Sequence, residues 1–165
     1  MATRPPDVTP DPDWIPADPL NLEATGRRSF VSGGRTGDRL RVAYYRREGE
    51  PGLVGRAWFG PGSEGPPGHA HGGSVAAVLD EAMGSSAWQD GYPVVAARLV
   101  TNFRKMLPLG TDARFEARVE RVDGRKVWAR GKLTDDDGDV FTDAEGLFII
   151  LPEERLEEFR RQFRQ

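Results

Sequence analysis

Apolar side chains gather first in two short runs, LRVAYYRR (40–47) and LVGRAWF (53–59). Between them EGEPG contains two glycines and a proline, a composition typical of a turn, so the pattern predicts two strands here. The next stretch, GPGSEGPPGHA (60–70), is too rich in glycine and proline for a regular element and is expected to be a loop.

The apolar spacing changes to a helical period at residue 72. In GGSVAAVLDEAMGSSAWQD (72–90) the larger apolar residues lie three or four positions apart: Val75, Val78, Leu79, Ala82 and Met83. This spacing places them on one face of an α-helix, which GYP (91–93) is expected to end.

Four strand-like segments rich in valine, phenylalanine, leucine and tryptophan follow: VVAARLVTNFRKM (94–106), DARFEARVERV (112–122), RKVWARGKLTD (125–135) and DVFTDAEGLFIIL (139–151). DG (123–124) and DDDGD (135–139) are expected to be hairpin turns, and such short connections imply an antiparallel meander. LPEERLEEFRRQFRQ (151–165) predicts a closing helix, because its acidic residues come early and its arginines late.

One long helix beside a sheet of this size predicts an α+β architecture, with the sheet packed around the helix. Residues 26–165 are expected to form this single domain. Residues 1–25 hold six prolines and several aspartates, which disfavour a helix or a central strand and predict an extended N-terminal arm. The arm is either a partly ordered tail, pinned by residues such as Trp14, or a segment that contacts another subunit or covers a site.

The composition narrows the function classes. The 165 residues include no cysteine, which excludes disulfides, iron–sulfur clusters and thiol catalysis. No apolar run approaches the ~20 residues of a membrane span, and MATRPPDVTPDPDW lacks the apolar region of a secretory signal, so we expect a cytoplasmic protein. The net charge of −3, without a basic stripe, gives no reason to expect a nucleic-acid partner.

The segment GPPGHAHGGSVAAVLDEAMG (65–84) places a carboxylate, Asp80, in an apolar helix. Its neighbours on one helical stripe are all small: Gly73, Ala76, Ala77, Gly84 and Ala87. Burial there would raise the pKa of Asp80 toward the range of a general base. The N–H groups of Gly72, Gly73 and Ser74 have no partner inside the helix and could stabilise an oxyanion. The alternative is a structural glycine turn followed by a solvated aspartate.

Three other motifs fit less well. GGSVA (72–76) lacks the last glycine of a GxSxG nucleophile elbow, and both histidines of the chain precede its serine. His69, His71 and Asp80 are too few and wrongly spaced for a zinc site. The acidic run 135–139 is too short for a calcium loop and is expected to be a solvated turn. We therefore expect no metal site.

Two motifs carry a resemblance to a known family. The first is HGG (71–73) with Asp80 nine positions after His71, and the second is TNFRKMLPLG (101–110), an asparagine–aromatic pair followed by basic residues and a Pro-x-Gly turn. They resemble the hotdog-fold acyl-CoA thioesterases of the phenylacetate-pathway (PaaI-like) and THEM4-like type, over roughly residues 40–150. The resemblance implies an antiparallel sheet wrapped around the helix, in homodimers or homotetramers with active sites at the subunit interface.

The resemblance also implies residue roles. Asp80 would be the base or nucleophile that delivers water to the thioester carbonyl, and the Gly72 N–H of another subunit would polarise that carbonyl. His71 would position the substrate or the loop. The substrate would be an acyl-CoA or an acyl carrier protein thioester, with coenzyme A as part of the substrate and no separate cofactor. Residues expected near the substrate are Gly73, Glu81, Ala96, Arg98, Asn102, Arg104 and Lys105, the last two as phosphate contacts or as ordinary exposed charges.

The sequence departs from the family pattern after the helix. Related enzymes often carry a serine or threonine that holds the attacking water, where this chain has Ala96. By strict strand alternation Thr101 faces away from Ala96, whereas Arg98 shares its face and could contact an acidic acyl group or pair with Glu81. Glu81 itself lies ~100° around the helix from Asp80. It is expected to be either a secondary carboxylate of the site or a structural partner.

Ala96 supports an alternative function, which is ligand binding without hydrolysis. Without a hydroxyl to hold water, the chain could be a hotdog protein that binds an acyl or aromatic ligand and does not hydrolyse it. A hotdog dehydratase fits less well, because the Asp–His spacing of such enzymes is not found cleanly here.

Overall fold

The computed structural model describes residues 10–33 and 36–162. Its elements are β1 (Trp14–Ala17), α1 (Leu22–Thr25), β2 (Leu40–Arg47), β3 (Leu53–Phe59), the 3₁₀ turn η1 (Pro61–Ser63), α2 (Gly72–Gln89), β4 (Val94–Phe103), β5 (Asp112–Asp123), β6 (Lys126–Thr134), β7 (Val140–Ile150) and α3 (Glu153–Gln162). The seven strands form one antiparallel sheet in the order β1-β2-β3-β5-β6-β7-β4.

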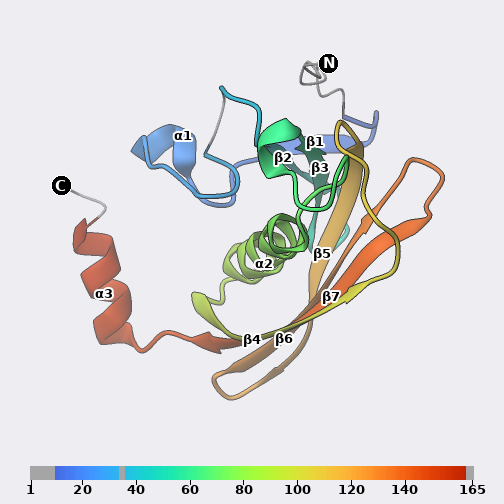
Figure 1. Ribbon diagram of the computed structural model, residues 1–165. Coiled ribbons are helices and arrows are strands. Elements are labelled where there is room, and N and C mark those ends of the chain that lie inside the picture. The colour runs from blue at the N-terminus through green and yellow to red at the C-terminus, as the bar shows by residue number, and fades with distance from the viewer. Residues whose placement is uncertain (1–9, 34–35, 163–165) are drawn as a thin grey trace.

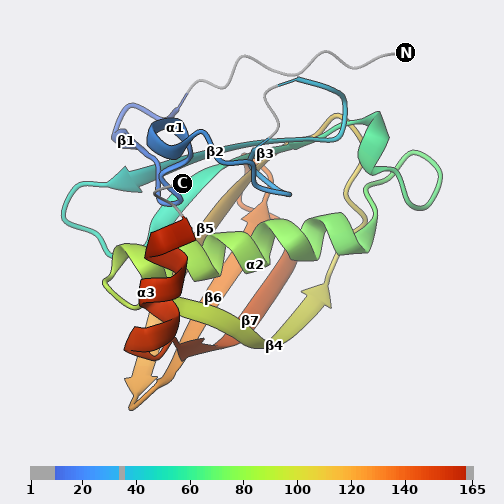
Figure 2. The same ribbon diagram turned by 90° about the vertical axis from the view of Figure 1, so that its left-hand side faces the viewer.

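The sheet curves around α2. Figure 1 looks roughly along this helix and shows strands on two sides of it, and Figure 2 shows the helix lying across them. The α+β prediction is confirmed, as are the long helix, the two strands before it, the four strands after it and both hairpin turns. The helix ends where expected, since Gly91 adopts the left-handed φ of 89° that allows the chain to turn away.

Side chains on the concave face of the sheet form rows from strand to strand. One row runs from Tyr44 through Gly55, Phe115, Leu133 and Thr142 to Phe103, and the next runs from Leu53 through Ala117, Gly131 and Ala144 to Thr101. Small residues let α2 approach the second row closely: a Cβ on Gly131 would come within 3.3 Å of Leu79 and Met83. Tyr44 is the only titratable side chain in these two rows.

The meander prediction is wrong in one respect. β4 pairs with β7, at the far edge of the sheet, and not with β5. The segment that connects β4 to β5 follows the loop before α2 instead, where the Ala70 N–H donates to Leu107 O and the Leu109 N–H donates to Gly68 O. This crossing places the end of β4 beside the start of α2.

The N-terminal arm is more regular than predicted. Its residues 14–17 form an edge strand and residues 22–25 form a helical turn, so the expectation that this segment holds no helix is wrong. Edge strands tolerate proline because one side of the strand makes no ladder bonds, which explains Pro16 within β1. Residues 1–9 of the predicted arm and residues 163–165 of the predicted closing helix lie outside the described residues.

A tryptophan surrounded by arginines fixes β1 to the sheet. Trp14 is buried and packs on Tyr45 with ring centroids 5.5 Å apart. The guanidinium carbons of Arg47, Arg56 and Arg114 lie 5.3–5.9 Å from its ring. Cation–π contacts are strongest when they are partly desolvated, as they are around this buried ring.

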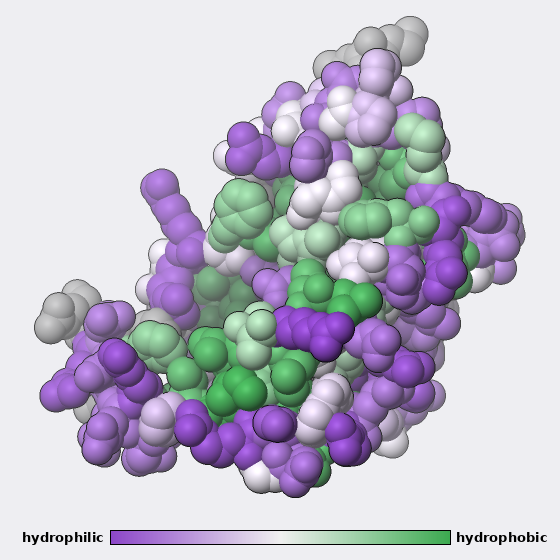
Figure 3. Space-filling model, turned by 60° about the horizontal axis from the view of Figure 1, so that its bottom comes forward, coloured by the Kyte–Doolittle hydropathy of each residue, from purple (hydrophilic) through white to green (hydrophobic). Residues whose placement is uncertain are grey.

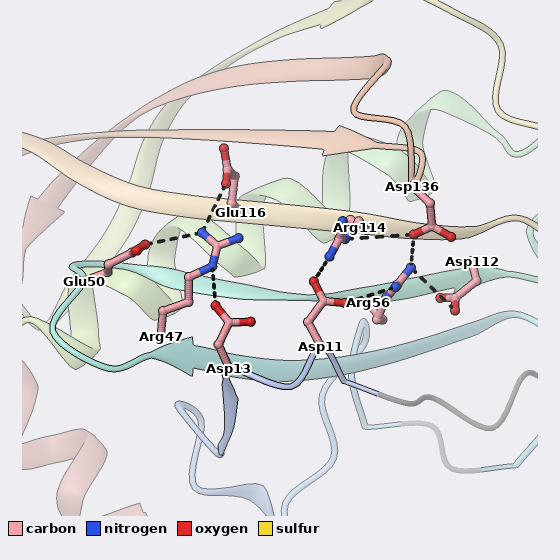
Figure 4. Close-up of polar contacts among 9 residues, drawn as sticks. All are labelled: Asp11, Asp13, Arg47, Glu50, Arg56, Asp112, Arg114, Glu116 and Asp136. Atoms are coloured by element: carbon pink, nitrogen blue, oxygen red, sulfur yellow. Dashed lines mark hydrogen bonds and ion pairs between the residues drawn. The ribbon is translucent and has the colours of Figure 1, made fainter.

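Aspartates of the arm complete this arginine cluster of Arg47, Arg56 and Arg114 (Figure 4). Asp11 contacts both Arg56 and Arg114, and Asp13 lies 3.9 Å from Arg47. Because the charges are linked in a network and stack on a buried ring, they hold the arm more firmly than isolated surface pairs would.

The opposite edge of the sheet is apolar and uncovered. β4 has no strand partner on its outer side among the described residues. The large apolar residues that remain exposed include Trp88, Val95, Val100, Phe103 and Met106, on β4 or beside it. Figure 3 shows an apolar area bordered by hydrophilic side chains on the side of the molecule that carries β4. Uncovered apolar edges of this kind are typical of association surfaces.

Candidate active site

The start of α2 offers one free backbone donor. His71 is the N-cap residue, and its Nδ1 accepts from the Gly73 N–H at 2.8 Å. The Ser74 N–H donates to His71 O at 2.9 Å. The Gly72 N–H has no acceptor among the described residues. The expected set of three donors is therefore reduced to Gly72, because the cap residue occupies the other two.

An aromatic ring lies over this donor. A Cβ on Gly72 would come within 3.3 Å of the ring of Phe103, at the end of β4. Beside them is a pocket of about 270 Å³, whose lining includes His69, Val75, Phe103, Met106 and Leu107. Arg104 and Lys105 line the same pocket. The arrangement can hold an elongated, partly apolar ligand close to a backbone donor at a helix N-terminus.

Asp80 lies about two turns further along α2 and is half-buried. Burial, and secondly the charge of Glu81, raises the pKa of Asp80 above its usual 3.8. One turn further, a Cβ on Gly84 would lie 3.4 Å from Phe148 of β7, which pairs with Ala96 of β4. Asp80 therefore lies on the flank of α2 that faces the open edge of the sheet. A raised pKa is compatible with a general base near neutral pH.

Glu81 points to the other flank. It accepts a hydrogen bond from the Tyr44 hydroxyl at 2.9 Å and another from Ser29 Oγ. The two adjacent carboxylates thus have separate surroundings, and the structure places Glu81 among structural partners. Sequence reasoning missed Ser29 and Tyr44, because nothing in their local pattern indicates which helix residue they meet.

A β-bulge in β4 corrects the predicted side-chain directions. Ala96 pairs with Phe148 and Arg98 pairs with Leu147, so Ala97 is an extra residue. Thr101, opposite Ala144, therefore shares the concave face with Ala96, and Arg98 lies on the convex face. The expectation that Arg98 faces the helix and Thr101 faces away is wrong, because strict alternation does not hold across a bulge.

Thr101 is thus the hydroxyl of β4 that faces α2. Its row on the sheet includes Gly131, which lies beneath Leu79 and Met83, so Thr101 is at the level of the helical turn that carries Asp80. It is partly buried, and its hydroxyl has no hydrogen-bond partner among the described residues.

The polar residues at the end of β4 are engaged with acids. Asn102 Nδ2 donates to Asp143 Oδ1 at 2.8 Å, and Arg104 Nε donates to Asp143 Oδ2 at 2.7 Å, which lowers the pKa of Asp143. Lys105 Nζ donates to Asp139 Oδ2 at 2.7 Å. Both cations are exposed, so a stronger anion such as a phosphate can replace these surface contacts at little cost.

Metal sites and membrane-spanning helices are absent from the part of the chain that the structure describes. The described residues contain no cluster of three metal-binding side chains, and no described helix is long and apolar enough to cross a bilayer. A cavity of about 1100 Å³ lies between residues 16–33 and β2 and is lined by none of the predicted site residues. The pocket beside Gly72 is smaller but has the chemistry that the sequence predicts, and we favour it on that ground.

A single chain does not bring Gly72 and Asp80 together. Eight residues separate them on one straight helix, which corresponds to ~12 Å along the axis at 1.5 Å per residue. One thioester cannot contact both groups over that distance. A site that uses both needs a second copy of the helix beside the first.

Comparisons with known proteins agree with this architecture. Residues 67–142 match the family model of the thioesterase superfamily. Over 93 residues the chain is 37% identical to the acyl-coenzyme A thioesterase THEM4 of Xenopus laevis, an alignment that covers 56% of this chain and 42% of that protein. The chain thus spans about two fifths of the length of that curated relative.

Solved structures of thioesterase-like proteins also superpose on this chain. The crystal structure of a thioesterase superfamily protein superposes with a TM-score of 0.61 at 31% identity, covering 66% of this chain and 53% of that one. A Bacillus halodurans protein crystallised with CoA superposes with a TM-score of 0.54 at 29% identity, covering 59% of this chain and 66% of that one. The predicted hotdog fold is confirmed, and the predicted similarity to thioesterases is found over residues 67–142. The phenylacetate-pathway subtype stays a prediction.

Proposed function

We propose that this chain is a thioesterase that hydrolyses an acyl-CoA, or an acyl carrier protein thioester, to a free acid and a thiol. The observation that carries the proposal is the combination of one free N–H, at Gly72, with one half-buried carboxylate, Asp80, on the same helix. The similarity to an acyl-CoA thioesterase and to a protein crystallised with CoA supports this substrate class.

In the proposed reaction Asp80 takes a proton from water as the water oxygen attacks the thioester carbonyl carbon. The carbonyl oxygen becomes an oxyanion, which accepts a hydrogen bond from the Gly72 N–H with the helix dipole behind it. The intermediate then breaks its C–S bond, and the leaving thiolate takes the proton from Asp80. His71 acts indirectly, because its cap occupies the Gly73 N–H and fixes the first turn.

Asp80 could instead attack the carbonyl carbon itself and expel the thiolate to form a mixed anhydride, which water then hydrolyses. After a single turnover in H₂¹⁸O, label in the Asp80 carboxylate would show nucleophilic attack followed by hydrolysis at the Asp80 carbonyl carbon. Label only in the released acid is expected for base catalysis and for an anhydride that water attacks at its acyl carbon, and rapid-quench detection of the acyl-enzyme distinguishes these two.

The active site is proposed to lie between two copies of the chain, with Gly72 from one and Asp80 from the other. The exposed apolar edge at β4 is the proposed contact surface, and pairing of dimers into tetramers stays a prediction. The test mixes two inactive variants, Asp80→Asn and Gly72→Pro. In a shared site, mixed dimers contain one intact site, so refolding the mixture should restore about a quarter of the wild-type activity. No recovery would place both groups in one subunit.

The acyl-CoA is proposed to lie in the pocket beside Gly72, with Arg104 and Lys105 near its phosphates. Coenzyme A enters as part of the substrate, and no metal or further cofactor is needed. Cytoplasmic location remains an expectation of the same kind. Dialysis against a chelator should leave turnover unchanged, and a loss that zinc or magnesium restores would contradict the metal-free chemistry.

Ala96 favours a second candidate, an acyl- or aromatic-ligand-binding protein without turnover. A methyl group at this position cannot hold water. Thr101 weakens this alternative, since its free hydroxyl faces the same side of the sheet. The two candidates differ in one measurable respect, which is the release of thiol.

The experiment is a panel of short, medium-length and aromatic acyl-CoAs, assayed with a thiol-trapping dye. Wild type is compared with Asp80→Asn and with Asp123→Asn, the same change at an exposed hairpin residue. We expect turnover by the wild type and by Asp123→Asn, and a loss of at least about 100-fold in Asp80→Asn. Binding without thiol release would support the second candidate, and full activity of Asp80→Asn would remove Asp80 from the mechanism.

A further inference from the structure

The Glu81 carboxylate, next to the candidate base Asp80, is held by two hydroxyl groups. Both of its oxygens accept from hydroxyl groups, Oε1 from Tyr44 and Oε2 from Ser29. No described lysine, arginine or histidine forms an ion pair with it. A carboxylate with two neutral donors and no cation keeps its negative charge in place without cancelling it.

These two bonds connect three parts of the chain that are distant in sequence. Tyr44 belongs to β2 and is buried, and burial, followed by the charge of Glu81, raises the pKa of its hydroxyl. It therefore stays a neutral donor. Ser29 Oγ also accepts from the N–H groups of Val31 and Ser32, both at 3.2 Å, so it belongs to a closed turn. Glu81 thus ties α2 to the sheet and to the segment before β2.

We propose that Glu81 is a positioning residue for Asp80: held by Tyr44 and Ser29, it fixes the rotation of the helical turn that carries Asp80 and places a fixed negative charge beside it. The proposal rests on the proposed function, since it assigns Asp80 as the base. A rotation of α2 would move both carboxylates together, because they are consecutive residues on one rigid helix.

The surroundings of the pair contain few other charges. The rows of the sheet that face α2 hold Tyr44 as their only titratable group, and the residues of β3, β4, β5, β6 and β7 in those rows are apolar, glycine or threonine. The turn at residues 29–32 offers hydroxyls and apolar groups. Glu81 is therefore the charge that Asp80 experiences most directly, in agreement with the raised pKa of Asp80. A base that is harder to ionise is a stronger base once ionised.

The test is an NMR titration of Asp80, made with ¹³C-labelled aspartate carboxyls and assigned by comparison with Asp80→Asn. It needs no substrate, so its outcome is separate from whether the chain hydrolyses thioesters. In Glu81→Gln the charge is lost and one hydrogen-bond acceptor is kept, so Asp80 should titrate at lower pH than in the wild type. Tyr44→Phe should broaden or move the Asp80 signal, because the helical turn loses one anchor. Glu157→Gln, an exposed residue of α3, is the matched control and should change nothing.

Turnover provides the second readout. The acid limb of the kcat/KM profile should move to lower pH in Glu81→Gln. At neutral pH kcat should fall about tenfold, less than the loss expected for removing the base itself. An Asp80 titration identical in wild type and Glu81→Gln would overturn the proposal. Absence of turnover in every variant, including the wild type, would overturn the proposed function and leave the titration result standing.

Discussion

The two sides of α2 differ in almost every respect. On one side Glu81 is bonded to Tyr44 and Ser29, and beyond it the sheet ends in a short, proline-containing strand fixed by Trp14 and the arginine cluster. On the other side Asp80 forms no ion pair with any residue that the structure describes, and the sheet ends in a ten-residue strand with exposed valines. The closed side satisfies its polar groups, and the open side leaves a donor, a carboxylate and a sheet edge available. Stability and reactivity are thus assigned to different sides of one helix.

The largest expected effect concerns one atom on the open side. Gly72→Pro removes the N–H while keeping a residue that suits the first helical position, and the extended ψ of 133° at His71 suits a following proline. We expect kcat to fall about 100- to 1000-fold. Gly72→Ala is the control, since it adds a similar Cβ near Phe103 and retains the N–H. Equal activities of the two variants would show that the donor is not used.

The second effect concerns the open edge itself. Val100→Lys places a charge on β4 that opposes pairing with another strand. We expect a monomer in sedimentation experiments and at least about a 100-fold loss of turnover, because each proposed site takes groups from two copies. Val122→Lys makes the same change at a residue of similar exposure, 38% against 36%, away from this edge. If both variants remain dimers, the contact lies elsewhere.

On the side of α2 that carries Glu81, substitutions around Trp14 should mainly lower the free energy of unfolding. Trp14→Ala removes a buried ring and its arginine contacts and should lower the free energy of unfolding by about 3 kcal/mol. Trp88→Ala, at the exposed end of α2, removes a partly exposed ring and one hydrogen bond to Val94 O and should cost about 1 kcal/mol. Denaturant titration of both variants measures the difference. A larger cost at Trp88 would reverse the contrast between the two sides.

The smallest expected effect is a gain in the free energy of unfolding when Asp80 is replaced. Because the folded pKa of Asp80 lies above its usual value, its ionisation favours the unfolded state, so stability present below pH 3.8 is lost as pH rises through the folded pKa. Asp80→Asn should therefore be more stable than the wild type at pH 7, by roughly 0.5–1 kcal/mol, and equal to it near pH 3. Thermal unfolding at the two pH values provides the check. A loss of stability at pH 7 would mean that Asp80 has a favourable partner in the folded protein.

The sequence predicts the elements well because each has its own local period. The helix at 72–89 and the strands around it follow from apolar spacing, and the HGG motif with Asp80 leads to the site. The pairing of β4 with β7 could not be predicted, since it depends on a crossing between distant segments. The partners of Glu81 could not either, because a side-chain contact across 37 or 52 positions has no local pattern.

The extra residue at Ala97 makes the effect of a deletion in β4 depend on where it falls. Ala96 and Arg98 pair with consecutive residues of β7, so deleting Ala97 would leave a regular strand, with Thr101 and Phe103 still on the concave face and Arg98 still on the convex face. Deleting Leu99 would instead turn the side chains on one side of the gap to the opposite face of the sheet. The loss of one residue is thus expected to be tolerated at the bulge and damaging two positions later.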